Sequence, residues 1–401
     1  MISRKYLIIP LGFLSALLMG TVYSWSVFRI PLENSLGISS SKSGLPFLVF
    51  LALYAFTMPV AGKLIERFKP SLIAITGSIL LSAGYLLSGY CSTIHQLVIG
   101  YGVLGGIGVG MLYGVPVVMA SRWFPGSKGI ATGAILLGFG LSPLVTAPVA
   151  STLIENYGVS DAFVLIGIGF LLLLPVMASF FTNPEDYSKQ KPSVAVYGDN
   201  LPVTRYSSFY LLWLLFFIVT FSGLMAISIS SPFSQSFLNI SSTDAAMILS
   251  LLALFNGMGR LLFGFMLDKA GFRITLIISY LLLIFSSLTI ATLSPGQSMK
   301  FVISMAILWG VFGGWLTIAP VSVIKLFGEL NSAKNYGKLF TAYGFGAIAG
   351  VTLASKVKEI TGRYDIIFFV VFFMAILGIF IISKMPLQKK KVIPVTEFTG
   401  K

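Results

Sequence analysis

The residue with the clearest chemical role is Arg260, which stands in the apolar segment ALFNGMGRLLFG at 253–264. A guanidinium inside a bilayer costs about 2.5–3.5 kcal/mol on insertion scales, so an arginine kept there generally has a function. All 13 acidic residues fall in loops, in tails or at the ends of apolar segments. The planar fork of an arginine matches a carboxylate group. The sequence therefore predicts that Arg260 binds an anionic substrate.

Two structural roles are the alternatives for Arg260: a salt bridge, or snorkelling of its long side chain to the membrane surface. Asp268 lies more than two helical turns away, about 12 Å along the axis, which argues against the salt bridge. Asn256 lies one turn before Arg260 on the same face, where its amide either donates to the anion or holds the guanidinium. A hydrogen bond between helices is the other interpretation of Asn256.

Aromatic side chains near the middle of other apolar segments are candidates for the walls of the same site. Three tyrosines lie far enough from the segment ends to disfavour a role as interfacial anchors, and they carry neutral donors. Trp315 is a candidate apolar wall. Ordinary packing is the alternative for each. The predicted substrate-binding set is therefore Arg260, Asn256, Tyr113, Tyr343, Tyr23 and Trp315.

The composition shows what must position these residues. Of 401 residues, 56% are hydrophobic and only 10% are charged. Apolar stretches recur, each long enough to cross a hydrocarbon core of about 30 Å as a helix. The first stretch is longer than the apolar part of a signal peptide and has no clear cleavage site, so we expect a retained helix. We predict an all-α membrane protein with twelve transmembrane helices, at 6–28, 44–65, 71–90, 97–120, 128–153, 160–182, 206–233, 244–267, 273–294, 299–325, 337–358 and 363–384.

The helices divide into two groups of six around a polar segment with three prolines. Most of the 27 Lys and Arg residues fall in cytoplasmic segments if both termini are placed inside. We therefore expect a multi-pass protein of the cell inner (cytoplasmic) membrane with both termini in the cytoplasm. The predicted domains are an N-terminal six-helix bundle at 1–182, a cytoplasmic linker at 183–205, a C-terminal six-helix bundle at 206–384 and a basic cytoplasmic tail at 385–401.

The two halves repeat. The turn after the second segment reads GKLIERFKP at 62–70, and the turn after the eighth reads GFMLDKAGFR at 264–273. Two six-helix halves with this motif resemble the major facilitator superfamily. The resemblance implies pseudo-symmetric bundles that enclose a cavity and rock about a central site. We expect a gating role for the turn residues Gly62, Glu66, Arg67, Gly264, Asp268 and Lys269.

A narrower resemblance rests on GTVYSWSVF at 20–28, the Asn256/Arg260 pair and AKNYGKLFTAYGFGAIAG at 333–350. These segments are similar to the oxalate/formate antiporter family and its bacterial monocarboxylate transporters. The resemblance implies that Arg260 is the carboxylate-binding arginine of the eighth helix and that Tyr113 lines the cavity. The family's oxalate exchanger has a lysine before a glycine in the eleventh helix, where this chain has Tyr343. One fixed charge suits a monoanion such as lactate, pyruvate or formate better than oxalate.

Other classes of function fit the sequence less well. With one cysteine and one histidine, and no acid within the apolar segments, there is no cluster for catalysis or for a metal, so we expect no enzyme activity, no cofactor and no metal. The net charge of +14 is not gathered in a basic domain, which disfavours nucleic acid. The expected partners are a small organic anion, the lipid bilayer, and either a proton or a counter-anion. An oxalate/formate-type exchanger, a porter for another organic anion and a non-transporting receptor-like relative stay open as alternatives.

Overall fold

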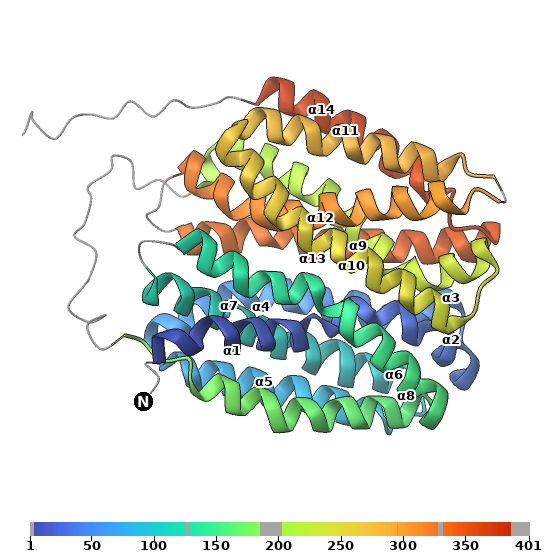
Figure 1. Ribbon diagram of the computed structural model, residues 1–401, viewed down its shortest axis with the longest axis horizontal. Coiled ribbons are helices and arrows are strands. Elements are labelled where there is room, and N and C mark those ends of the chain that lie inside the picture. The colour runs from blue at the N-terminus through green and yellow to red at the C-terminus, as the bar shows by residue number, and fades with distance from the viewer. Residues whose placement is uncertain (1–3, 125–127, 185–202, 295, 328–331, 386–401) are drawn as a thin grey trace, which may run out of the picture.

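The structure, a computed structural model, describes residues 4–124, 128–184, 203–294, 296–327 and 332–385 (Figure 1). All regular structure within these ranges is helical, with no strand among them. Because lipid offers no hydrogen-bond partners, a spanning segment must pair its backbone groups internally, as a helix does. The prediction of an all-α membrane protein is confirmed.

The first half of the chain forms the helices from α1 to α8. Their bounds are α1 Arg4–Met19, η1 Gly20–Ser24, α2 Trp25–Leu36, α3 Ser40–Ser43, α4 Leu45–Arg67, α5 Pro70–Ser88, α6 Ile94–Leu97, η2 Val98–Gly105, α7 Gly106–Trp123 and α8 Lys128–Ser179. The second half forms α9 Ser207–Leu238, α10 Ser242–Lys269, α11 Phe272–Ala291, α12 Ser298–Phe327, α13 Ser332–Thr361 and α14 Ile367–Lys384.

The first membrane passage is longer than the sequence predicts. Helices α1, η1 and α2 follow one another without a break, and the apolar stretch runs over Tyr6–Leu36. The predicted end at residue 28 is wrong because the charges at Arg29 and Glu33 interrupt the apolar pattern without ending the helix. Gly37, with φ of +60°, ends it instead by adopting the left-handed conformation that glycine tolerates.

Ten helices of the described residues are long and apolar enough to span a membrane. One of them, α8, contains two predicted segments, because Gly158 (φ +85°, ψ 165°) folds the chain back on itself. Helix α13 has lysines at both ends and is less apolar, so it is not among the ten. With the second arm of α8 and with α13, the helices make the twelve predicted passages.

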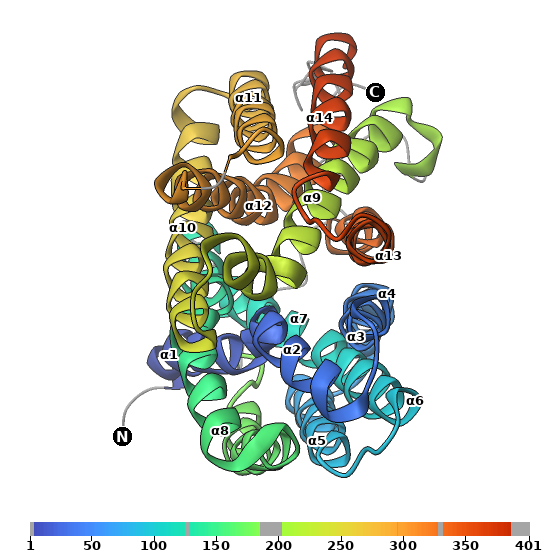
Figure 2. The same ribbon diagram turned by 90° about the vertical axis from the view of Figure 1, so that its right-hand side faces the viewer.

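The two sets of helices lie side by side. In Figure 2, α1–α8 gather on one side of the molecule and α9–α14 on the other. Helix α10 packs against α8, and α13 packs against α4. The predicted linker and tail fall largely on residues 185–202 and 386–401, which lie outside the described residues. Helix α1 begins and α14 ends at one end of the bundle, here the terminal face, and α3 lies at the opposite end, here the α3 face (Figure 1).

Glycines set the distance between α10 and α12. A Cβ atom added at Gly259 would lie 2.0 Å from the carbonyl oxygen of Gly310, and one at Gly313 would lie 2.0 Å from the carbonyl oxygen of Asn256. Small residues allow such close approach of transmembrane helices. The packing fixes the backbone of the helical turn that carries Asn256 and Arg260.

Candidate functional site

Arg260 projects from α10 toward α8 of the other half. Its side chain is buried, with 3% of its surface exposed. Nη1 donates to the carbonyl oxygen of Leu136 on α8 at 2.6 Å, and Nη2 donates to Oδ1 of Asn256 at 3.4 Å. Nε is buried and has no hydrogen-bond partner within the described part of the chain. The guanidinium therefore lies between the halves and retains free hydrogen-bonding capacity.

No carboxylate among the described residues lies within 4.0 Å of the Arg260 guanidinium; the ion pairs that join two described residues are Arg29 with Glu33 and Arg363 with Asp365. Asp268 is exposed at the end of α10. Burying one charge without a counter-charge costs several kcal/mol, because hydration is lost and little replaces it. Neither alternative raised by the sequence, a salt bridge or snorkelling, describes the observed position of this side chain.

Asn256 is completely buried and fixed on both sides of its amide. Nδ2 donates to the carbonyl oxygen of Trp309 on α12 at 3.2 Å, while Oδ1 accepts from Arg260. The residue thus orients the guanidinium and also links two helices. Two roles suggested by the sequence, holding the guanidinium and bonding one helix to another, describe the contacts of Asn256. Direct contact of Asn256 with a substrate stays a prediction.

Tyr23 of η1 and Tyr343 of α13 meet across the two halves. Their hydroxyl oxygens lie 2.9 Å apart, and both side chains are buried. The ring of Phe139 on α8 packs edge-on against Tyr23 at 5.0 Å and against Tyr113 of α7 at 5.4 Å. The three predicted tyrosines therefore belong to one aromatic cluster built from four passages.

The sequence interpretation missed Tyr54 and Tyr336, which the structure adds. The ring of Tyr336 lies 5.5 Å from that of Phe340, which stacks on Tyr343 at 4.7 Å. The ring of Tyr54 on α4 lies 5.3 Å from that of Tyr113 and 5.6 Å from that of Tyr343. Its mid-segment position was the same signal that selected the other tyrosines.

Trp315 lies apart from this cluster. Its indole Nε1 donates to Oγ of Ser279 on α11 at 3.0 Å, and its ring packs against Phe216 and Tyr280. These contacts lie among α9, α11 and α12, so the structure uses Trp315 to pack the second half. Spacing along the helix did not reveal which way the indole points.

The predicted turn motif lies on the terminal face, at the ends of α4 and α10. Gly62, Arg67, Asp268 and Lys269 are exposed, and Gly264 is half-buried near Thr317. The side chain of Glu66 lies outside the description. A gating role for these residues stays a prediction.

Arg29 is a buried arginine that the sequence analysis did not single out. Its side chain is 0% exposed, on α2. The sequence placed it in a loop because it directly follows the predicted end of the first segment. The described part of the chain therefore buries two arginines, Arg260 in contact with α8 and Arg29 near the α3 face.

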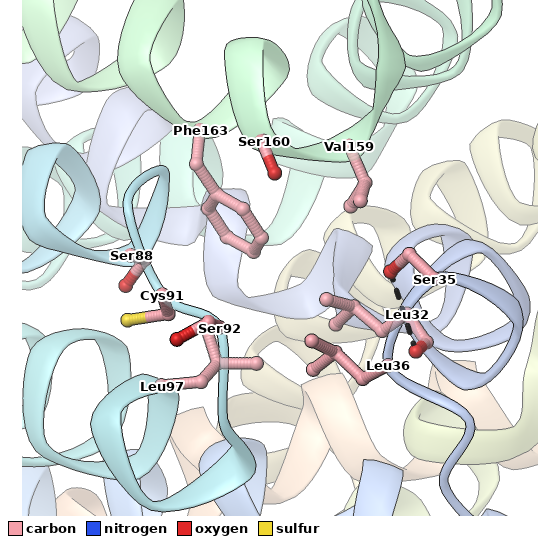
Figure 3. Close-up of a pocket in the computed structure, with 10 residues that line it drawn as sticks. All are labelled: Leu32, Ser35, Leu36, Ser88, Cys91, Ser92, Leu97, Val159, Ser160 and Phe163. Atoms are coloured by element: carbon pink, nitrogen blue, oxygen red, sulfur yellow. Dashed lines mark hydrogen bonds between the residues drawn. The ribbon is translucent and has the colours of Figure 1, made fainter.

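A separate cavity of about 260 Å³ opens within the first half near the α3 face (Figure 3). Leu32 and Leu36 of α2 point into it opposite Phe163 of α8. No charged side chain lines it, so it offers nothing to balance an anion. Burial raises the pKa of the Cys91 thiol, which lines the cavity in the connection after α5.

The family model described as Major Facilitator Superfamily matches residues 11–351 and 212–398. The chain therefore belongs to the Major Facilitator Superfamily, and it is a membrane transporter by that membership. The structure superposes on a D-xylose-proton symporter with a TM-score of 0.77 at 15% identity, covering 98% of this chain and 99% of that one. It also matches a bacterial homologue of the human lysosomal transporter Spinster in an inward-facing, occupied conformation (TM-score 0.73, 18% identity, coverage 96% and 97%). These likenesses confirm the fold.

Among curated relatives, the oxalate:formate antiporter of Oxalobacter formigenes is 27% identical, with 98% of this chain and 94% of that protein covered. Monocarboxylate transporter 13 of Rattus norvegicus is 24% identical, with 89% and 83% covered. The resemblance to this group that the sequence motifs indicated is confirmed, and these relatives are transporters, not enzymes.

Gly140 of α8 provides the space in which Arg260 lies. An added Cβ atom would stand 2.9 Å from Oδ1 of Asn256 and 3.0 Å from Nε of Arg260. We predict that Gly140→Ala displaces the guanidinium and lowers substrate uptake by reconstituted protein about tenfold or more, because small displacements in a binding site are costly. Gly133→Ala on the same helix is the matched control, since an added Cβ there meets nothing within 4 Å. Equal uptake by the two variants would contradict the contact.

Proposed function

We propose that this protein is a secondary transporter that carries a small monocarboxylate, of the lactate, pyruvate or formate class, with Arg260 binding the carboxylate between the two halves. The observation that carries the proposal is a buried guanidinium with an unpartnered Nε and no carboxylate within 4.0 Å among the described residues. An incoming carboxylate supplies the missing charge and accepts from the free donor.

The charge at the site favours a monoanion. Arg260 contributes one positive charge, and the neighbouring cluster contributes neutral hydroxyls, among them the Tyr23 and Tyr343 pair. A monocarboxylate is neutralised by this arrangement, whereas a dianion retains one negative charge in a medium of low dielectric constant. The tyrosine hydroxyls then donate to the substrate's remaining oxygen atoms.

The arrangement of contacts supports alternating access. The halves touch through α10 and α8 on one side of the molecule and through α13 and α4 on the other (Figure 2). Rocking of the halves opens the cluster first to one face of the membrane and then to the other. We assign the terminal face to the cytoplasm from the bias of Lys and Arg residues.

An oxalate/formate-type exchanger is the second candidate, because the relative of that name matches 98% of this chain. Formate is a monoanion and fits either candidate. A porter for another organic anion would take up none of the small monocarboxylates or oxalate. A receptor-like relative would bind an anion without any uptake. The test is uptake of radiolabelled lactate, pyruvate, formate, acetate and oxalate by proteoliposomes, with and without a pH gradient and with and without internal anion.

Conversion of Arg260 to Lys keeps the charge and removes the planar fork. We predict that Arg260→Lys lowers kcat/KM for the best substrate of the panel about 10- to 100-fold, since a hydrogen bond to a charged group contributes about 1.5–3 kcal/mol. Arg273→Lys is the matched control, because Arg273 is exposed and donates to the carbonyl oxygen of Ser383. Wild-type kinetics in Arg260→Lys would contradict binding by the fork.

A second cation should change the preferred substrate. We predict that Tyr343→Lys lowers the KM for oxalate relative to that for formate about tenfold, because the new ammonium balances the second carboxylate. Assays at about pH 6 keep a buried lysine charged. Tyr343→Phe removes the hydroxyl without adding charge and serves as the control. High oxalate uptake by the wild type, or no shift in Tyr343→Lys, would contradict the one-charge account.

A further inference from the structure

Arg29 is held by a dense set of hydrogen bonds near the α3 face. Nε donates to Oγ of Ser43 at 3.0 Å, and Nη2 donates to the carbonyl oxygen and Oγ of Ser40 at 2.6 and 2.9 Å. Nη1 donates to the carbonyl oxygen and Oγ of Ser228 at 3.1 and 3.4 Å. Nη2 also donates to Oγ of Ser355 at 3.4 Å. The guanidinium is thus fully buried and every nitrogen has an acceptor.

These acceptors come from both halves of the molecule. Ser40 and Ser43 belong to α3, and Arg29 itself belongs to α2; both helices are in the first half. Ser228 lies on α9 and Ser355 on α13, both in the second half. A Cβ atom at Gly44 would lie 2.9 Å from Oγ of Ser355, so the two halves are in close contact here. Arg29 therefore ties the halves together at the α3 face.

The acceptors from the second half are all neutral. The carboxylate near Arg29 belongs to Glu33, one helical turn away on α2, at 3.9 Å from Nε and with 24% of its side chain exposed. Glu33 also accepts from Oγ of Ser43 at 2.5 Å, so it is shared between two donors. When the halves part at the α3 face, Arg29 keeps its bonds to α3 and loses those to Ser228 and Ser355.

The donors released in that movement face the space that opens. Nη1 loses the carbonyl oxygen and Oγ of Ser228. Nη2 loses Oγ of Ser355 and keeps its two bonds to Ser40. Arg29 lies on the same passage as Tyr23 of the central cluster, six residues or about 9 Å further along the helix axis. Helix α2 continues η1 without a break, contacts α8 and turns Leu32 and Leu36 toward the first-half cavity (Figure 3), so α2 carries Arg29 with that half.

We propose that Arg29 is an outer anion-binding residue, which captures the substrate carboxylate at the open α3 face before the anion reaches Arg260. This inference rests on the proposed carboxylate transport. A carboxylate replaces the neutral serine acceptors on Nη1 and Nη2, because a charged acceptor forms the stronger hydrogen bond. When the anion moves inward, Ser228 and Ser355 take its place and the face closes.

The test measures substrate affinity separately at each face, in right-side-out and inside-out membrane vesicles. Arg29→Gln should raise the KM for substrate added at the α3 face about tenfold and change the KM at the terminal face less than about twofold. Arg29→Lys keeps the charge and should restore most of the affinity at the α3 face. Arg363→Gln is the matched control, since Arg363 is exposed near the start of α14 and paired with Asp365.

If Arg29 only held the halves together, its replacement would change the KM at the α3 face in the opposite direction. Losing such a tie favours the open α3 face, so the KM at that face would fall and the KM at the terminal face would rise. The Ser228→Ala/Ser355→Ala double variant loosens the tie while keeping Arg29, and its KM at the α3 face should be unchanged or lower.

An unchanged or lowered KM in Arg29→Gln at the α3 face overturns the proposal while carboxylate transport stands. Absence of carboxylate uptake by the wild type in both kinds of vesicle overturns the proposed function, and this inference with it.

Discussion

The positive charge of Arg260 is buried between two helical bundles with no carboxylate of the described chain within 4.0 Å, and the rest of the structure depends on this constraint. Such a charge is costly in lipid and is tolerated only where the surrounding helices hold it in place. The carbonyl oxygen of Leu136 and the amide of Asn256 occupy two of its donors. What remains is an incomplete electrostatic site, which a transported anion completes in the function proposed above.

The rest of the fold serves to place that charge. Glycines bring α10 and α12 into backbone contact, and Gly140 leaves room on α8 for the guanidinium. The tyrosine cluster packs around Phe139, one helical turn from Leu136 on α8, and it adds hydroxyl groups that carry no charge of their own. In the Major Facilitator Superfamily the halves must separate and rejoin, so contacts between them have to be reversible. Neutral hydroxyl acceptors, such as those that Ser228 and Ser355 offer to Arg29, meet that requirement.

Much of this arrangement could be predicted from the sequence, because lipid restricts a spanning chain to helices and makes a buried charge conspicuous. Twelve passages, Arg260, and the one-turn spacing to Asn256 follow from hydropathy and helical geometry alone. The direction of a side chain does not, which is why Trp315 was grouped with residues that it does not contact. Arg29 was missed because a charge near the end of an apolar run looks like the start of a loop. Only the fold shows the acceptors that α3, α9 and α13 bring to it.

The central claim is tested most directly by anion binding to the purified protein and to an Arg260→Gln variant, measured as ligand-dependent thermal stabilisation. A monocarboxylate that binds only the folded state stabilises it by about 2.7 kcal/mol at about 100 times its Kd. The account predicts that formate, lactate or pyruvate stabilises the wild type in this way and leaves Arg260→Gln unchanged at every concentration. Equal stabilisation of the two proteins would show that the anion binds elsewhere and would contradict the account.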